Sequence, residues 1–368
     1  MTTNAIALAQ KINSEFKKLQ AQQQFGRIAN LIETSLEILP HRYNLQIFGY
    51  IPGIFRQIEI ENCIIQPHDI YLGEPVVYKL YFRDRQKLYG FSYFYVFCYL
   101  KLDSTALNVY FQSANYHYKK LTPEEYNLSS NKISFEGSTS AFKNNNISVI
   151  SVSDPGHFVP GISSSFYLGS AELNFNQVIA EVLEQICQLA KIKLSNTMLF
   201  GSSAGTIGAL LSSTYLKYKT NVLAVNSQIN LHYRNDLMQH FFHLTKPKKI
   251  LERFGEQASC TYRFNQDLVS IPNIYILANV NDNLFQRNFK FYQQYITKFT
   301  KPEVNNQSVF DSYYGVAGHG RPEANSLKAK IRIAREVLTM RSNINTKFDS
   351  AKDIVGSKHE SKIQAKVE

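Results

Sequence analysis

The spacing of apolar side chains predicts helices at the start of the chain and strands after them. Between residues 4 and 37, apolar positions recur three or four residues apart, which predicts one or two amphipathic helices. From Leu45 to Phe111, β-branched and aromatic runs broken by turn residues predict a meander of strands at 46–50, 57–65, 76–82, 91–102 and 107–111. We expect the N-terminal helices to form an appendage to the rest of the molecule.

The second half of the chain alternates between the two patterns. A strand at 147–152 is followed by a helix at 175–190, strand 197–200, helix 206–218, strand 222–225, helical patches within 234–254, strand 274–278, helix 286–299, strand 308–314 and helix 322–339. This alternation is typical of a mostly parallel sheet with helices on both faces, which defines an α/β fold. We expect a helical extension over 1–43, one α/β domain over 44–340 that begins with a β-rich part over 44–105, and a flexible polar tail over 341–368.

Composition restricts the class of protein. The 368 residues are 44% hydrophobic, with 17 Gly and 11 Pro, so the chain can bury a large core and is neither collagen-like nor of low complexity. Four cysteines, at 63, 98, 187 and 260, form no CxxC pair and no Cys/His cluster, so we expect no disulfide framework, no metal site and a reducing compartment. The first 25 residues lack the apolar core of a secretory signal, and the longest apolar run, 91–100, is too short to span a membrane. We therefore expect a cytoplasmic protein.

The chain is basic, with 40 Lys and Arg against 29 Asp and Glu and a formal net charge of +11. Such a charge favours anionic partners: a phosphorylated cofactor, an acidic glycan, nucleic acid or a membrane surface. The basic residues are scattered, with local density only at 119–120 and 246–249. A generally basic, solvated surface is therefore the simpler interpretation.

The most informative segment is residues 198–208, an apolar strand that continues into a Gly-x-Ser-x-Gly turn and then a helix. The turn places Ser203 between Gly201 and Gly205. A nucleophile elbow has this order, because its serine sits on a strained strand-to-helix turn where neighbouring residues must be small. The N–H of Ala204 and the positive end of the following helix would face the oxygen of an incoming carbonyl. The segment therefore predicts a nucleophilic serine.

Two other interpretations apply to the same turn. Gly201, Gly205 and Gly208 fit a loose glycine pattern that can hold a dinucleotide between a strand and a helix. Such turns normally follow the first strand of a fold, however, and about 200 residues precede this one. The acidic residue that would bind the ribose is also missing from 221–225. In the remaining interpretation, the small residues only allow a helix to pack closely on a strand.

A serine nucleophile needs a base and an acid, which in this architecture follow in the order serine, acid, histidine. Asp282 comes after the predicted strand 274–278, and His319 stands between glycines after the predicted strand 308–314. Both positions are loops at the C-terminal ends of strands, and no other histidine combines this place with this order. The predicted triad is therefore Ser203, Asp282 and His319. The reserve acids are Asp267 and Glu303.

Other predicted site residues lie on neighbouring loops. The turn after the predicted strand 107–111 could supply a second oxyanion donor, and the backbone N–H groups of Ala114 and Asn115 fit that position. Asp154 and His157 follow the predicted strand 147–152 and are candidates for substrate contact, although a plain turn is the simpler interpretation.

A long connection over 226–268 is rich in Phe and basic residues, and we interpret it as a lid over the substrate pocket. Its lysines Lys246, Lys248 and Lys249 could bind phosphate groups as point charges. The alternative is that they merely solvate a loop.

At these residues the chain resembles α/β-hydrolase-fold proteins, and more narrowly bacterial capsule-polysaccharide O-acetyltransferases and related capsule-biosynthesis proteins. The matching segments are 109–114, 199–211 with its Gly-Ser-Ser-x-Gly pattern, 225–228, 281–282 and 318–319. The resemblance covers about residues 105–338 and is strongest at the elbow. It implies an α/β-hydrolase-like fold, Ser203, Asp282 and His319 as triad members, and acetyl-CoA as acyl donor. It does not extend to the first 100 residues, which leaves the acceptor glycan open.

Three functions are compatible with this sequence. An O-acyltransferase would pass an acyl group to a sugar hydroxyl, an esterase would use water as the acceptor, and a non-catalytic capsule-assembly protein would carry a vestigial elbow. The basic charge and the missing export signal favour a cytoplasmic transferase. The resemblance implies that this transferase O-acetylates a capsular polysaccharide from acetyl-CoA. We expect acetyl-CoA and a polysaccharide acceptor as partners, no nucleic acid and no integral membrane span. A homo-oligomer and peripheral membrane association stay open.

Overall fold

The computed structural model describes residues 2–38, 55–59, 65–81, 93–114, 133–143, 146–159, 162–266, 269–285, 308–316 and 318–338. Three predicted segments lie outside these residues: the strand at 46–50, the helix at 286–299 and the tail from 341 onward. In the described ranges, no helix is long and apolar enough to cross a membrane.

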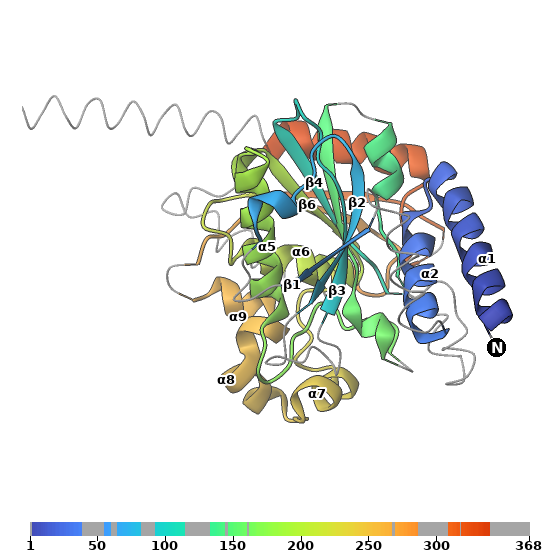
Figure 1. The fold of residues 1–368 in the computed structure, drawn as a ribbon. Helices are drawn as coiled ribbons and strands as arrows, with labels where there is room; N and C mark the ends of the chain where they lie inside the picture. Colours follow the sequence, from blue (N-terminus) through green and yellow to red (C-terminus); the bar gives the residue numbers. More distant parts are fainter. Residues whose placement is uncertain are drawn as a thin grey trace, which may run out of the picture.

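The described residues contain nine strands, which form a single sheet in the order β1-β2-β3-β5-β4-β6-β7-β8-β9 (Figure 1). The strands are β1 (Phe55–Glu59), β2 (Pro75–Tyr81), β3 (Tyr93–Tyr99), β4 (Ala106–Phe111), β5 (Ile147–Val152), β6 (Thr197–Ser202), β7 (Asn221–Val225), β8 (Asn273–Asn279) and β9 (Ser308–Tyr313). Only β3 runs antiparallel to its neighbours, and every other pairing in this sheet is parallel. The predicted mostly parallel sheet is therefore confirmed.

The predicted meander is wrong. Strand β5 lies between β3 and β4, although it follows both in sequence, and β1 pairs with β2 in parallel. A meander joins sequence neighbours by antiparallel hairpins, whereas a parallel pair needs a crossover connection. The apolar runs correctly indicated strands, but pairing order depends on contacts that are distant in sequence.

One face of the sheet is covered by helices that follow β5 in sequence. These are α5 (Phe175–Leu189), α6 (Gly205–Ser213), α7 (Asn235–Phe242), α8 (Pro247–Ala258) and α9 (Cys260–Phe264). Their apolar side chains pack with alternate residues of the strands, such as Leu199 on β6 and Val222 on β7. Strands β6, β7 and β8 are buried along their whole length, because helices cover both of their faces.

The opposite face is covered by α1 (Thr2–Ala21), α2 (Phe25–Ile38) and a helix over residues 324–338. The ring of Phe25 lies 4.8 Å from that of Phe97 on β3, and Glu33 forms an ion pair with Lys79 on β2 at 2.7 Å. The two N-terminal helices are thus not an appendage. They form part of the second helical layer and bury the apolar face of the sheet (Figure 1).

Candidate active site

The segment at the end of β6 has the geometry of a nucleophile elbow. Ser203 has a φ of +51°, in the left-handed region that side chains other than glycine rarely adopt. A Cβ atom on Gly201 would lie 2.3 Å from the carbonyl oxygen of Gly205, and one on Gly205 would lie 2.5 Å from that of Phe111. Larger residues cannot occupy either position without moving the backbone. The glycines are therefore required by the turn, as the sequence pattern indicated.

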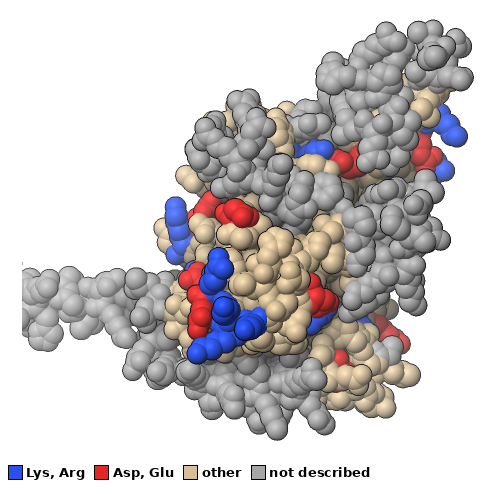
Figure 2. Space-filling view, turned by 90° about the horizontal axis from the view of Figure 1, so that it is seen from below, with Lys and Arg blue, Asp and Glu red and all other residues tan. Residues whose placement is uncertain are grey.

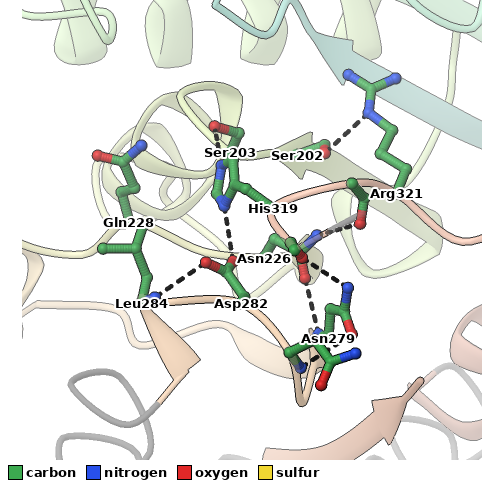
Figure 3. Close-up of polar contacts among 12 residues, drawn as sticks. Ser202, Ser203, Asn226, Gln228, Asn279, Asp282, Leu284, His319 and Arg321 are labelled. Atoms are coloured by element: carbon green, nitrogen blue, oxygen red, sulfur yellow. Dashed lines mark hydrogen bonds and ion pairs between the residues drawn. The ribbon is translucent and has the colours of Figure 1, made fainter. Parts of the chain in front are cut away.

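The structure brings together the side chains of Ser203, His319 and Asp282 (Figure 3). Nε2 of His319 lies 2.7 Å from Oγ of Ser203, and Nδ1 lies 2.6 Å from Oδ2 of Asp282. The other carboxylate oxygen of Asp282 accepts a hydrogen bond from the N–H of Leu284 at 2.9 Å. An ionised carboxylate can only accept, so Nδ1 carries the proton and Nε2 is left to accept the proton of the serine hydroxyl.

Parallel pairing explains why residues so distant in sequence meet. Strands β6, β7, β8 and β9 are consecutive neighbours in the sheet and run in the same direction. Their C-terminal ends therefore lie along one edge, from which Ser203, Asp282 and His319 emerge after β6, β8 and β9. The acid is buried, with its side chain 3% exposed, whereas the histidine side chain is 31% exposed. Solvent or substrate can thus reach the base but not the acid.

The predicted oxyanion residues lie on adjacent strand ends. Ala204 is buried and precedes α6, where the partial positive charge of the helix N-terminus lies. Ala114 follows β4, which pairs with β6 so that Phe111 stands opposite Gly201. Asn115 lies outside the described residues. A Cβ atom on Gly205 would lie 2.5 Å from the carbonyl oxygen of Phe111, so the two segments are neighbours. The role of their N–H groups stays a prediction.

Two buried asparagines, Asn226 and Asn279, hold the loop that carries His319, and sequence reasoning missed them. The side-chain amide of Asn226, after β7, donates to the carbonyl oxygen of Gly320 at 2.9 Å. That of Asn279, at the end of β8, donates to the carbonyl oxygen of Gly318 at 2.6 Å. Both flanks of His319 are therefore fixed by amides from neighbouring strands. The signal in the sequence was an asparagine directly after an apolar strand, in two consecutive strands of the sheet.

Tyr313 adds a third contact to this loop. Its hydroxyl donates to the carbonyl oxygen of Gly320 at 2.5 Å and accepts a hydrogen bond from Asn226 at 2.8 Å. Burial raises the pKa of Tyr313 above its usual value, so the hydroxyl keeps its proton and remains a donor. Neutral hydrogen bonds thus hold the loop that carries His319.

A second network that the sequence did not reveal centres on Arg321. Its Nε donates to Oγ of Ser202 at 2.9 Å, and its Nη2 binds Oε1 of Glu136 at 2.6 Å and Oγ of Ser113. Ser113 follows β4, Ser202 ends β6 and Arg321 follows the histidine loop. The guanidinium group therefore connects three loops around the elbow. Figure 3 shows it on the side of Ser203 away from Gln228.

The prediction that Asp154 contacts substrate is wrong in this structure. Asp154 is 1% exposed, and its carboxylate accepts hydrogen bonds from the backbone N–H of Gly156 at 2.8 Å and from the hydroxyls of Ser164 and Ser165. These contacts close a buried turn and occupy both oxygens. For His157, the structure describes the backbone position in the short 3-10 helix Pro155–Phe158 and not the side chain. The reserve acids, Asp267 and Glu303, also lie outside the described residues.

The segment proposed as a lid contains α7, α8 and α9. Its residues Phe241, Phe242 and Phe254 are buried and belong to the same apolar core as the elbow helix α6. Lys246, Lys248 and Lys249 are exposed at the start of α8, and none of the three forms an ion pair with the described residues. Figure 2 shows Lys and Arg side chains gathered on the side of the molecule where α7 and α8 lie in Figure 1. Closure over a substrate stays a prediction.

The three cysteines that the structure describes are poorly placed to act as nucleophiles. Cys98, Cys187 and Cys260 are free and buried, and burial raises the pKa of each thiol, that of Cys187 to about 12. Such thiols stay protonated and unreactive. Among the residues that the structure describes, no group of three or more His, Cys, Asp and Glu side chains could hold a metal ion.

The strand order, the elbow and the chain order serine, aspartate, histidine together define an α/β-hydrolase-type fold. No family model and no curated protein matches the chain. Similar solved structures include the capsule O-acetyltransferase of Neisseria meningitidis serogroup A, 14% identical, with a TM-score of 0.46 over 67% of this chain and 90% of that one. An esterase of Thermogutta terrifontis is 12% identical, with a TM-score of 0.44 over 70% and 91%. An esterase of Pyrobaculum calidifontis is 15% identical, with a TM-score of 0.40 over 72% and 85%.

Proposed function

We propose that Ser203, His319 and Asp282 form a catalytic triad for serine-dependent acyl transfer. The observation that carries this proposal is the pair of contacts at 2.7 Å and 2.6 Å that joins the strained serine to the histidine and the histidine to the buried aspartate. Nε2 of His319 accepts the serine proton while Oγ attacks the acyl carbonyl carbon, and the imidazolium that forms is stabilised by Asp282. The same nitrogen then donates the proton to the leaving group, which leaves an acyl-serine.

The oxyanion of the tetrahedral intermediate would be stabilised by the N–H of Ala204 together with an N–H near Ala114. The segment with Ala114 follows β4, which lies beside the strand that carries the elbow. Ala204 lies at the start of α6, where the helix N-terminus adds positive potential. In the second half of the reaction, the hydroxyl of an acceptor gives its proton to Nε2 of His319 and attacks the acyl carbonyl carbon. His319 then passes that proton to the departing Oγ, which breaks the acyl-serine bond and restores Ser203.

In the finer form of this proposal, the donor is acetyl-CoA, the acceptor is a hydroxyl of a capsular polysaccharide, and the protein acts in the cytoplasm without nucleic acid. The exposed ammonium groups of Lys246, Lys248 and Lys249 suit the phosphates of the donor, because no carboxylate of the described chain neutralises them. The resemblance of the elbow to capsule O-acetyltransferases points the same way. Hydrolysis is the second candidate function, since the 31% exposure of the His319 side chain gives water access to the base.

Covalent labelling tests the shared mechanism and separates the two functions. The protein is exposed to a serine-directed phosphonate and to acetyl-CoA, with and without capsular polysaccharide, and the adduct is mapped by mass spectrometry. We expect the adduct on Ser203 and a loss of turnover by several orders of magnitude in Ser203→Ala, because triad members act as a unit. Transfer of the acetyl group to the glycan supports the transferase, whereas acetate release that no glycan diverts supports the esterase.

The matched control is Ser213→Ala, which removes a buried hydroxyl from α6. Among the residues that the structure describes, this hydroxyl bonds the carbonyl oxygen of Leu210 and no other group. It should keep activity. An adduct on Ser202, or activity that survives Ser203→Ala, would show that the nucleophile has been assigned to the wrong residue.

A further inference from the structure

The side chain of Gln228 lies beside the nucleophile and has no role in the mechanism described above. Its backbone is tied to the elbow through Thr206, whose hydroxyl donates to the carbonyl oxygen of Gln228 at 3.0 Å and lies 2.6 Å from the carbonyl oxygen of Ser203. The N–H of Gln228 binds the same hydroxyl at 3.0 Å. In Figure 3, the side-chain amide of Gln228 and the hydroxyl of Ser203 both point away from Asp282.

The amide of Gln228 is unpaired, and its atoms reach solvent, since neither belongs to the fully buried unpaired polar atoms of the described residues. The residue is 8% exposed, and within the described part of the chain neither its amide nitrogen nor its amide oxygen forms a hydrogen bond. In the free protein such an amide can bond water, which a substrate group with matching donors and acceptors can replace. An unpaired, solvent-accessible amide beside the candidate nucleophile is therefore available to bind a polar group of the substrate.

The strand order shows which part of a substrate this amide would meet. The oxyanion groups lie toward β4 on one side of β6, whereas Gln228 follows β7 on the other side. In a tetrahedral intermediate on Ser203, the oxyanion points to the first side. The oxygen of the leaving or accepting alcohol points to Nε2 of His319, which comes from β9 across β7 and β8. Gln228 therefore lies on the alcohol side.

We propose that the amide of Gln228 binds a hydroxyl group of the alcohol, next to the oxygen that carries the acyl group. A primary amide offers both a donor and an acceptor, and so does a hydroxyl, which makes the pair mutually satisfying. A simple alkyl or aryl alcohol offers no such group. Gln228 is thus a specificity-determining residue for polyhydroxylated alcohols such as sugars. This inference rests on the proposed function and applies equally to transfer to a sugar and to hydrolysis of an acetylated sugar, because both pass through the same intermediate.

Two esters of acetic acid test the proposal. One is a monoacetylated methyl glycoside, which keeps a free hydroxyl beside the ester, and the other is p-nitrophenyl acetate, which has none. In Gln228→Leu we expect kcat/KM for the sugar ester to fall about three- to tenfold, the range for one lost neutral hydrogen bond, with little change for p-nitrophenyl acetate. Gln228→Glu, which keeps the shape and the acceptor, should lose less.

The control is Gln239→Leu, which removes an exposed glutamine from α7 and should change neither substrate. Equal losses on both esters in Gln228→Leu, or no loss on either, would overturn the inference while the triad stands. If wild-type protein turns over neither ester and takes no phosphonate on Ser203, the proposed function itself fails and the role of Gln228 fails with it. Thermal unfolding of each variant establishes that the fold is kept.

Discussion

At the scale of single residues, the geometry suits the three members of the proposed triad to different tasks. The carboxylate of Asp282 is almost wholly buried and accepts one hydrogen bond from His319 and one from the backbone N–H of Leu284. Its proposed task is to hold the imidazole in one tautomer and orientation. It never contacts the acyl group.

This assignment predicts the behaviour of Asp282→Asn. The amide that replaces the carboxylate can donate to Nδ1, which shifts the imidazole proton to Nε2, and Nε2 then cannot accept the proton of Ser203. We expect kcat to fall by a factor of about 10³ to 10⁴. The rate of phosphonate labelling should fall in parallel, and the thermal unfolding midpoint should stay close to that of the wild type.

The reserve acids, Asp267 and Glu303, become relevant if this prediction fails. If Asp282→Asn keeps most of its activity, the acid is another carboxylate, and Asp267→Asn and Glu303→Gln become the variants to measure. The sequence could predict that Ser203, Asp282 and His319 meet, because each follows a recognisable strand or stands in a recognisable motif. It could not identify Gln228 or Arg321, since their significance depends on which strand ends become neighbours in the sheet.

At the scale of elements, the loop after β9 is positioned by the ends of β7 and β8. Asn279 contributes most of these contacts. Its amide nitrogen donates to the carbonyl oxygens of Gly318 and Gly315, and its amide oxygen accepts from the N–H of Gly315 at 2.9 Å. Because the residue is fully buried, water cannot replace these contacts. The strand that precedes the acid thus also sets the position of the base.

We predict that Asn279→Ala lowers kcat by about ten- to a hundredfold with a much smaller change in KM, because a small displacement of the base weakens proton transfer more than binding. The matched control is Asn273→Ala, at the other end of the same strand. Asn273 is also buried, and its amide bonds Asn221, far from the histidine loop. Both variants should unfold more easily than the wild type, but only Asn279→Ala should lose activity.

Steady-state kinetics and urea unfolding of the two variants distinguish positioning from general destabilisation. Equal losses of kcat in both would assign Asn279 a purely structural role.

Most of the helices and strands could be predicted from the sequence, since β5, β7 and α5 begin and end within a residue or two of their apolar runs. Their pairing could not, because β5 has the same apolar pattern whether it lies beside β3, β4 or both.

At the scale of the whole molecule, the N-terminal helices complete the second apolar layer. The sequence showed that α1 and α2 have apolar faces but not what those faces contact. Phe25 is 2% exposed and packs against Phe97 at the centre of β3. An amphipathic pattern is the same for a helix in a separate extension and for one on a sheet, which explains why the appendage was predicted in error.

The packing predicts a large cost for Phe25→Ala. Removal of a fully buried phenylalanine lowers the free energy of unfolding by about 3–5 kcal/mol, from lost burial and from the cavity left behind. The control Tyr218→Ala removes an aromatic ring that is 70% exposed and should cost less than about 1 kcal/mol. Urea unfolding measures both. A small cost for Phe25→Ala would mean that the first two helices contribute little to the stability of the sheet domain.

The bridge formed by Arg321 has a consequence for the free protein, before any substrate binds. Because its guanidinium group joins Glu136 and Ser113 after β4 to Ser202 in the elbow, and because it stands two residues after His319, the oxyanion side and the base side cannot drift apart independently. The relative placement of these loops is fixed during folding. In the proposed reaction, the entropy of ordering the loops is therefore not lost again in each turnover. The site is therefore already organised in the free protein.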